Sequence, residues 1–263
     1  MSDFEDVTYE DKDGVAWITI NRPQVLNALR RQTYEELRDA VKQATADPTI
    51  GVMVLTGAGD KAFCSGGDVK TQATRTVHEG REQLRVVMEM GAAMRTSGKP
   101  IIAAVNGWCI GAGNELNIMS DLTIASDRAR FGQVGPKVGS VPILGALQVM
   151  PRMIGEKRAR ELVFLCHQYT AAQAVEIGLA NKVVPHDELY SAVDEWCQEL
   201  LDKSPRSLRI AKVLMNHATD LEYNTYFTGS ELLASTYGDE ENLEGVHAFL
   251  EKRPPNYRKF RRP

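Results

Sequence analysis

Four short segments in the first half of this chain are apolar at nearly every position, and helical patterns separate them. The apolar segments span residues 15–20, 51–56, 101–105 and 122–125. Segments 33–46 and 80–96, which lie between them, have the periodicity of amphipathic helices. Strands that are apolar on both faces are typical of a parallel sheet covered by helices. The alternation therefore predicts a layered α/β core.

The second half of the chain has a different pattern, because strands nearly vanish after residue 144. Helical patterns cover residues 144–154, 157–166, 187–202, 206–218, 226–237 and 241–252. We therefore expect a core over residues 1–200 and a C-terminal helical region over residues 201–263. Thr33 and Glu36 have the spacing of a capping box, which places the start of the first long helix at Thr33.

Composition and charge exclude several classes of protein. The 263 residues carry 31 Lys and Arg against 35 Asp and Glu, a net charge of −4 that gives no support for a nucleic-acid partner. No apolar run reaches the roughly 18 residues needed to span a bilayer, and the acidic start is unlike a signal peptide. We therefore expect a cytoplasmic protein without a membrane partner. The four cysteines and five histidines lack the spacing of a disulfide framework or a metal site.

Three glycine-bearing turns, at residues 62–68, 106–116 and 131–140, follow predicted strands or precede predicted helices. Small residues before a helix leave main-chain N–H groups free to bind an anion. Two such turns facing one point would form an oxyanion hole, although each turn alone is also compatible with an ordinary loop. Leu116 stands where a dinucleotide fingerprint needs its last glycine, and neither a P-loop nor a GxSxG motif is present.

Glu115 follows the second of these turns and begins an apolar helix. A carboxylate in the first turn of a helix has an ordinary interpretation as a cap or as a partner of the helix dipole. The alternative is an acid or base that works beside the glycine turns. Its position alone leaves both interpretations open.

Taken together, these motifs resemble the crotonase superfamily, also called the enoyl-CoA hydratase/isomerase family. The resemblance covers almost the whole chain and rests on the order of its motifs. They are Asn21-Arg22-Pro23 with Asn27-Ala28, residues 62–68, 106–116 and 131–133, then Ala171, Ala174, Gly178-Leu179-Ala180 and Val183-Val184-Pro185. It implies a spiral of ββα units with a C-terminal helical trimerisation region. It also implies a homotrimer or homohexamer, and a CoA thioester as substrate without a separate cofactor.

The resemblance further implies roles for individual residues. The main-chain N–H groups of Gly67 and Ala112 would hold the thioester oxygen as it gains enolate charge, with Ala112 in place of the usual glycine. Glu115 and Tyr237 would take part in catalysis. Substrate or CoA contacts would fall on Leu26, Ala28, Ser65, Gly66, Asp68, Val69, Gly111, Gly135, Ser140 and Lys252. Asp68 has a second interpretation as a residue that caps or fixes its loop.

The acidic residues combine features of more than one branch of the family. Glu115 matches one of the two glutamates of the hydratases, whereas Gly135 stands at the position of the other. The segment 131–140 and Tyr237 resemble dihydroxynaphthoyl-CoA synthases and ketocyclohexanecarboxyl-CoA hydrolases, but Pro142 replaces their aspartate.

We predict an enoyl-CoA hydratase or dehydratase acting on an unsaturated acyl-CoA, including alicyclic or aromatic-derived ones. In this prediction Glu115 is the only catalytic carboxylate, and the hydroxyl of Tyr237 or Ser140 assists it. The apolar run 141–144 holds the pKa of Glu115 near neutral by desolvation. The alternatives are ring-forming or ring-cleaving carbon–carbon chemistry, double-bond isomerisation, and a non-catalytic CoA-binding scaffold.

Overall fold

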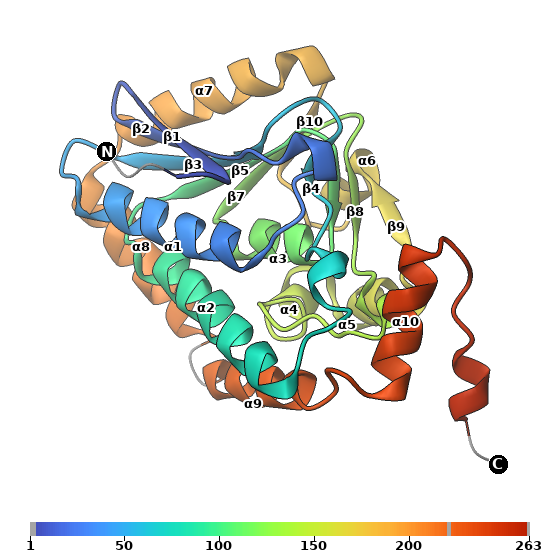
Figure 1. Ribbon diagram of the computed structural model, residues 1–263. Helices are drawn as coiled ribbons and strands as arrows, with labels where there is room; N and C mark the ends of the chain where they lie inside the picture. Colours follow the sequence, from blue (N-terminus) through green and yellow to red (C-terminus); the bar gives the residue numbers. More distant parts are fainter. Residues whose placement is uncertain (1–3, 220–221, 262–263) are drawn as a thin grey trace.

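A computed structural model describes residues 4–219 and 222–261 of the chain (Figure 1). Its main sheet has six strands in the order β1-β2-β3-β5-β7-β10, in which β1 is antiparallel to β2 and the remaining neighbours are parallel. These strands are β1 (Val7–Lys12), β2 (Val15–Ile20), β3 (Val52–Gly57), β5 (Ile101–Val105), β7 (Leu122–Ser126) and β10 (Lys182–Val184). The four strands predicted from apolar runs are β2, β3, β5 and β7, and they are confirmed.

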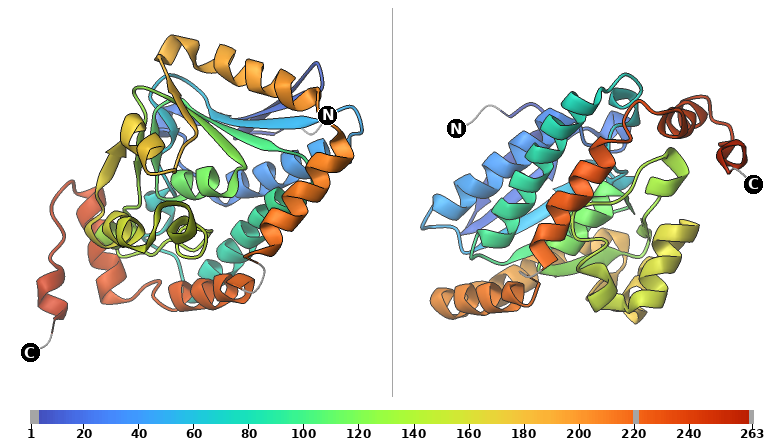
Figure 2. Two further views of the ribbon diagram at one scale, coloured as in Figure 1. Left: turned by 180° about the vertical axis from the view of Figure 1, so that it is seen from behind. Right: turned by 90° about the horizontal axis from the view of Figure 1, so that it is seen from below.

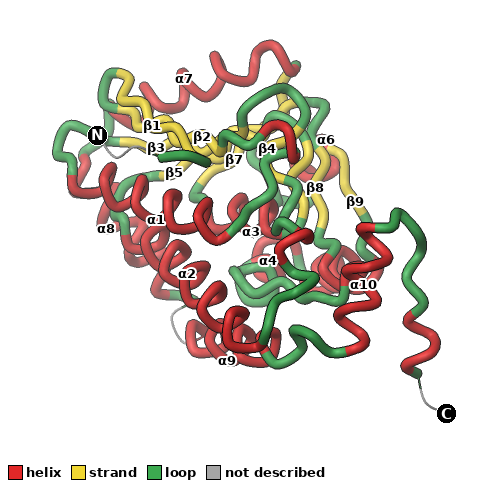
Figure 3. Tube along the Cα trace, in the orientation of Figure 1, coloured by secondary structure: helices red, strands yellow, loops and turns green. Residues whose placement is uncertain are grey.

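A second sheet of four short strands has the order β4-β6-β8-β9. The strands are β4 (Ala62–Cys64), β6 (Trp108–Ile110), β8 (Arg130–Gly132) and β9 (Gln168–Thr170). The first three run parallel, whereas β9 is antiparallel to β8. The chain alternates between the sheets, because β3 and β5 in the first sheet are followed by β4 and β6 in the second (Figure 3). This confirms the spiral of ββα units.

Helices cover both faces of the main sheet (Figure 1). α1 (Arg31–Ala46), α2 (Val77–Thr96) and α3 (Ala112–Met119) lie on one face, and α7 (Leu189–Leu201) lies on the other. Neighbouring residues of one strand therefore enter different cores. In β2, Ile18 packs in the core with α1 and α2, while Trp17 packs in the core with α7. This two-sided burial is the physical reason that the strands are continuously apolar.

The C-terminal region is helical, as predicted. It contains α8 (Pro205–His217), α9 (Tyr223–Ala234) and α10 (Glu240–Leu250), and α9 and α10 lie at the end of the molecule away from α7 (Figure 2). α9 packs against α2, and α10 packs against the turns η2 (Val69–Thr71) and η3 (Gly135–Val138). The last helices therefore return to the loops that carry the glycine motifs. Within the described ranges, the structure contains no helix that is long and apolar enough to cross a membrane.

The shorter elements complete the chain. They are η1 (Pro23–Val25), α4 (Met150–Ile154), α5 (Glu156–Arg160), η4 (Glu161–Leu165), α6 (Ala171–Glu176), η5 (His186–Glu188) and η7 (Tyr257–Phe260).

Two predictions of local structure are wrong. The segment 144–154 is helical only in α4, because Gly145 adopts a φ of +80° and its carbonyl oxygen accepts the N–H groups of the turn that follows. α1 begins at Arg31 rather than at Thr33, because Arg30 takes the N-cap position and Thr33 Oγ1 accepts the Arg30 N–H. The Glu36 carboxylate is thereby left to bind main-chain N–H groups of the N-terminal segment.

Candidate active site

The first two glycine turns lie against each other. Gly66 and Gly111 have φ angles of +111° and +56°, which side chains rarely adopt, so each turn needs its glycine. A Cβ atom on Gly66 would lie 3.2 Å from the carbonyl oxygen of Ile110 and 3.8 Å from the nitrogen of Ala112. α3 also packs directly on β4, because a Cβ on Gly113 would lie 2.2 Å from the carbonyl oxygen of Cys64. The absence of side chains therefore lets the two turns meet.

Both turns present main-chain N–H groups without an acceptor in the described part of the chain. They include the N–H groups of Gly67 and of Ala112, whereas the neighbouring Gly111 N–H donates to the carbonyl oxygen of Gly132. Ala112 is the first residue of α3, where N–H groups have no partner within the helix. Free main-chain donors on adjacent turns are groups of the kind that can bind an oxygen carrying negative charge.

Glu115 lies in the first turn of α3 and is only 6% exposed. One carboxylate oxygen, Oε1, accepts the N–H groups of Ile143, at 2.7 Å, and of Leu144. Burial raises the pKa of the Glu115 carboxyl to about 7, although the two hydrogen bonds act in the opposite direction. The apolar segment after Ser140 therefore both buries the carboxyl and fixes its orientation.

Two tyrosines lie in the electrostatic field of Glu115. Tyr237 is buried after α9, where its ring occupies the space that a side chain on Gly80 of α2 would fill, with the Arg75 guanidinium 5.1 Å from the ring centre. Tyr34 of α1 is also buried, and its pKa is raised well above 10 by burial and then by the nearby Glu115 charge. Burial likewise raises the pKa of Tyr237. Both hydroxyls therefore stay protonated and able to donate.

The sequence analysis did not identify Tyr34 or Arg75. Tyr34 occupies a position on the apolar face of α1, where a tyrosine is indistinguishable from a core residue. The residue type itself was a signal, because a buried tyrosine normally needs a partner for its hydroxyl.

The first glycine turn pairs with the segment after η1. The Ser65 N–H donates to the carbonyl oxygen of Leu26 at 3.0 Å, and the Leu29 N–H donates to that of Gly66 at 2.8 Å. Leu26 is 39% exposed, so its side chain remains open to a ligand. The Asp68 carboxylate accepts the Lys70 N–H and begins η2, which agrees with its interpretation as a loop-fixing residue. Of the other predicted contacts, Ala28 lies in the segment that follows η1, and Val69 is half-buried at the start of η2.

Gly135 and Ser140 lie together in the third glycine turn, whereas Lys252 lies after α10. The Ser140 N–H donates to the carbonyl oxygen of Gly135 at 3.0 Å, which closes the turn around η3. Lys252 follows α10 with an exposed side chain, and its N–H donates to the carbonyl oxygen of Phe249. Nothing in the described residues connects the Lys252 side chain to the glycine turns.

The two cysteines near the turns are buried and un-ionised. Cys64 and Cys109 are fully buried, and burial raises the pKa of the Cys64 thiol to about 12. A thiol at such a pKa is not ionised at neutral pH. Over residues 4–219 and 222–261, no group of three or more His, Cys, Asp or Glu side chains is arranged to hold a metal ion.

Comparison with known proteins identifies the family. The sequence profile of the enoyl-CoA hydratase/isomerase family matches residues 10–260. An enoyl-CoA hydratase from Mycobacterium avium subsp. paratuberculosis is 28% identical, with a TM-score of 0.86 over 96% of this chain and 98% of that one. An enoyl-CoA hydratase from Bacillus anthracis is 30% identical, with a TM-score of 0.79 over 96% and 99% of the two chains.

An enoyl-CoA hydratase/isomerase from Pseudoalteromonas atlantica is also similar, at 26% identity and a TM-score of 0.86 over 96% of this chain and 99% of that one. The chain therefore belongs to the enoyl-CoA hydratase/isomerase family, whose members are acyl-CoA enzymes. This family assignment does not separate its ring-processing branches, so the likeness to those branches stays a prediction.

Proposed function

We propose that this protein hydrates an unsaturated acyl-CoA, or dehydrates the corresponding hydroxyacyl-CoA. The observation that carries the proposal is the position of Glu115, a buried carboxyl in the first turn of α3, the same turn that presents the free N–H group of Ala112. Burial brings the pKa of this carboxyl to about 7, so near neutral pH it exchanges a proton with little cost in either direction. An acid or base of this kind beside an oxyanion hole suits proton transfer next to a thioester.

The proposed hydration uses one carboxylate for two proton transfers. The N–H groups of Gly67 and Ala112 bind the thioester oxygen. Glu115 removes a proton from water as the water oxygen bonds to the β carbon, and the electrons of the C=C bond move onto the thioester oxygen. The protonated Glu115 then returns a proton to the α carbon, which restores the carbonyl. The elements of one water molecule are added and Glu115 is regenerated. Tyr237 or Ser140 would orient the water.

Double-bond isomerisation is the second candidate, and Gly135 favours it. An isomerase needs one base that moves a proton between the α and γ carbons, whereas two-glutamate hydratases use a second carboxylate where this chain has Gly135. Ring-forming or ring-cleaving chemistry has less support, because Pro142 replaces the acidic residue of those branches. A scaffold without activity would not require a buried carboxyl beside two free donors.

Assays with four substrates separate these proposals. Crotonyl-CoA and a cyclic dienoyl-CoA test hydration, a β,γ-enoyl-CoA tests isomerisation, and a β-ketocyclohexane acyl-CoA tests ring cleavage. We expect hydration of at least one enoyl-CoA, and its loss in Glu115→Gln. The control is Glu35→Gln, which removes a carboxylate that pairs with Arg31 on the surface of α1. If only the β,γ-enoyl-CoA is turned over, the activity is isomerisation and the hydration proposal is wrong. CoA-ester binding without turnover of any substrate would favour a non-catalytic role.

We further propose a homotrimer or homohexamer that acts in the cytoplasm on a CoA ester, without a separate cofactor. The apolar side chains exposed on α8 support self-association. In this proposal the loops around Leu26, Ser65 and Ser140 contact the substrate, and the exposed Lys252 meets the CoA phosphates.

A further inference from the structure

The free donor at Gly67 lies in a short stretch of backbone pairing between two loops. Leu29 donates its N–H to the carbonyl oxygen of Gly66, and its own carbonyl oxygen accepts the N–H of Asp68, both at 2.8 Å. Leu29 and Gly67 therefore form an isolated parallel β-bridge, and the Gly67 N–H points away from Leu29. The direction of this donor depends on how firmly the segment 26–29 is held against the segment 65–68.

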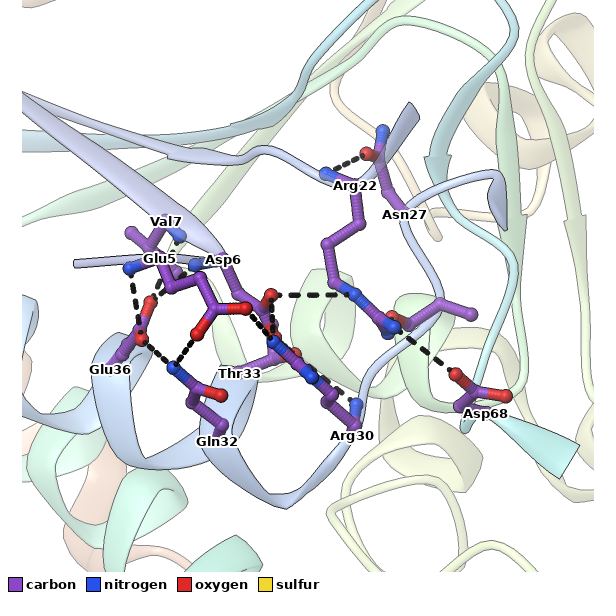
Figure 4. A network of polar contacts seen from close by, with 11 residues as sticks. Glu5, Asp6, Val7, Arg22, Asn27, Arg30, Gln32, Thr33, Glu36 and Asp68 are labelled. Carbon is purple, nitrogen blue, oxygen red and sulfur yellow. Dashed lines mark hydrogen bonds and ion pairs between the residues drawn. The ribbon is translucent and has the colours of Figure 1, made fainter. Parts of the chain in front are cut away.

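The side chain of Arg22 connects these two segments (Figure 4). Its Nη1 donates to the carbonyl oxygen of Ala28 in the first segment, and its Nη2 donates to Asp68 Oδ2 in the second, at 3.2 Å. Its Nε lies 3.5 Å from Asp6 Oδ1. The Arg22, Asp68 and Asp6 side chains are only 11%, 13% and 5% exposed. Charges that are so little exposed to water hold their partners strongly, and a planar guanidinium fixes the direction of each contact.

The N-terminal segment completes this arrangement (Figure 4). Asp6 Oδ2 accepts hydrogen bonds from Arg30 Nε at 2.7 Å and from Thr33 Oγ1 at 2.6 Å. The Glu36 carboxylate in turn accepts the N–H groups of Glu5, Asp6 and Val7. Asp6 is thus fixed from α1, and it holds the guanidinium of Arg22 from the side opposite the glycine turn. Each charged group has a partner, so the support is rigid.

We propose that Arg22 is the positioning residue that sets the direction of the Gly67 N–H donor, and that Asp6 and Asp68 hold it in place for this role. The inference rests on the proposed function of Gly67 as an oxyanion donor. Without the guanidinium, the Asp6 and Asp68 carboxylates lose their shared counter-charge and the contact with Ala28 is broken. The pairing between the two segments then loosens, and the donor moves away from the thioester oxygen.

The test measures the carbonyl itself and not only activity. Crotonyl-CoA labelled with ¹³C at the thioester carbonyl is bound to protein carrying Glu115→Gln, which suppresses turnover, and the infrared C=O stretch is recorded. An oxyanion hole polarises the carbonyl and lowers this frequency relative to free crotonyl-CoA. In the Arg22→Met variant we expect less than half of that lowering. With Glu115 intact, kcat on the substrate turned over by the wild type falls about a hundredfold, whereas KM changes little.

Arg22→Lys keeps the charge but loses the planar guanidinium with its several N–H donors. Compared with Arg22→Met, it should therefore recover only part of kcat and of the frequency shift. Asp68→Asn leaves Arg22 in place and weakens one contact, which keeps the test informative if Arg22→Met does not fold. We expect it to lower kcat roughly tenfold. The control is Arg38→Met on α1, which removes an arginine paired with Asp39 and Glu89 and should leave kcat and the C=O frequency unchanged.

The outcomes distinguish this inference from the proposed function. A lowered frequency in the parent protein that persists unchanged in Arg22→Met and Asp68→Asn would overturn the role of Arg22 alone. A loss of thermal stability with unchanged kcat and frequency would do the same, because it would mark a purely structural ion pair. If the parent protein does not lower the frequency at all, Gly67 is not an oxyanion donor and both proposals are wrong.

Discussion

At Glu115 two influences of opposite sign act on one carboxyl group. Removal from water penalises the charged form, whereas the N–H groups of Ile143 and Leu144 stabilise it. Burial is the larger effect, which is why the pKa is raised to about 7 and not lowered. The hydrogen bonds engage one oxygen and leave Oε2 without a partner in the described residues. This second oxygen is therefore the one that we expect to exchange protons with water or substrate.

The first prediction concerns the pH dependence of activity. If the ionised Glu115 acts as the base in hydration, kcat/KM should rise with pH through about 7 and then level off. The Glu115→Gln variant should lose this transition and fall by about 1,000-fold in kcat, within the range usual for a general acid or base. Rates measured between pH 5 and 9 for both proteins provide the test. A glutamine variant with full activity would exclude Glu115 from the chemistry.

The second prediction concerns stability, for which the sign follows from the same pKa. An unfolded glutamate has a pKa near 4.5, whereas the folded one is at about 7, so the folded protein binds more protons between these values. The free energy of unfolding should therefore be highest, for this group, below pH 4.5. It should fall as the pH rises to 7, by about 3 kcal/mol in all.

Glu115→Gln should not show this loss, since glutamine does not ionise. Urea unfolding at pH 5, 6, 7 and 8 compares the two proteins, and the other titrating groups cancel in the difference. We expect the free energy of unfolding of the variant, minus that of the wild type, to increase up to pH 7 and then to stay constant. A difference that does not change with pH would mean that the carboxyl is not desolvated.

At the scale of elements, the turn around η3 controls the loop that holds Glu115. A Cβ atom on Gly135 would lie 3.0 Å from the carbonyl oxygen of Ser140 and 3.3 Å from the Cα of Val141. This is tighter than a normal contact, so a larger residue at position 135 pushes on the backbone that leads to Ile143 and Leu144. A glutamate at position 135 would therefore require this backbone to shift by a few tenths of an ångström.

The third prediction follows from this packing. Gly135→Glu restores a carboxylate at the position where two-glutamate hydratases carry one, yet we expect it to lower kcat roughly tenfold, by displacing the loop and with it Glu115. Gly229→Ala in α9 is the matched control, because a Cβ there meets no atom within 4 Å. Steady-state kinetics on the preferred substrate decide the matter. A faster Gly135→Glu variant would show that the loop yields and that the missing glutamate limits the enzyme.

Elements that are buried on both faces could be predicted from the sequence, whereas elements defined by tertiary contacts could not. β3 and β5 are buried at every residue, and nearly all of their side chains are apolar, because both faces enter a core. β4, β6 and β8 contain only three residues each, too few for a pattern to emerge. The early helix start in α1 has a similar cause, since Glu36 binds a segment 30 residues away instead of capping its own helix.

The residues of the candidate site also divide into those that the sequence could predict and those that depend on tertiary contacts. Glycine is required where two turns approach, and the glycines alone indicated free N–H groups at these turns. The choice of Gly67 and Ala112 as donors, and a role for Glu115, came from the resemblance to the family. The contribution of Arg22 could not be predicted, because its partner Asp68 is 46 residues away and only the fold brings them together. Tyr34 was missed because its side chain faces the interior of the protein, and hydrophobic periodicity does not distinguish a hydroxyl near a carboxylate from a core ring.

At the scale of the whole molecule, α8 has two unlike faces. Lys212 points inward and is buried, and its Nζ contacts Asp121 at 2.7 Å and the carbonyl oxygen of Lys99. The other face exposes a group of apolar side chains. They are Ile210, Val213, Leu214 and Met215, with exposed fractions of 53%, 52%, 65% and 77%. An anchored helix with so much apolar surface in water is typical of an interface between subunits.

The last prediction tests that interface through Leu214 and Met215. If α8 packs against a second copy, a carboxylate at both positions must be desolvated on assembly, which costs far more than the apolar contacts contribute. The variant with Leu214→Glu and Met215→Glu should therefore sediment as a 29.1 kDa monomer, whereas the wild type sediments as a trimer or larger assembly. Gln198→Glu on α7 adds the same kind of charge at an exposed position and should not change the mass. An assembled double variant would place the interface elsewhere, whereas a monomeric wild type would leave the exposed face of α8 unpaired and remove the argument for a trimer.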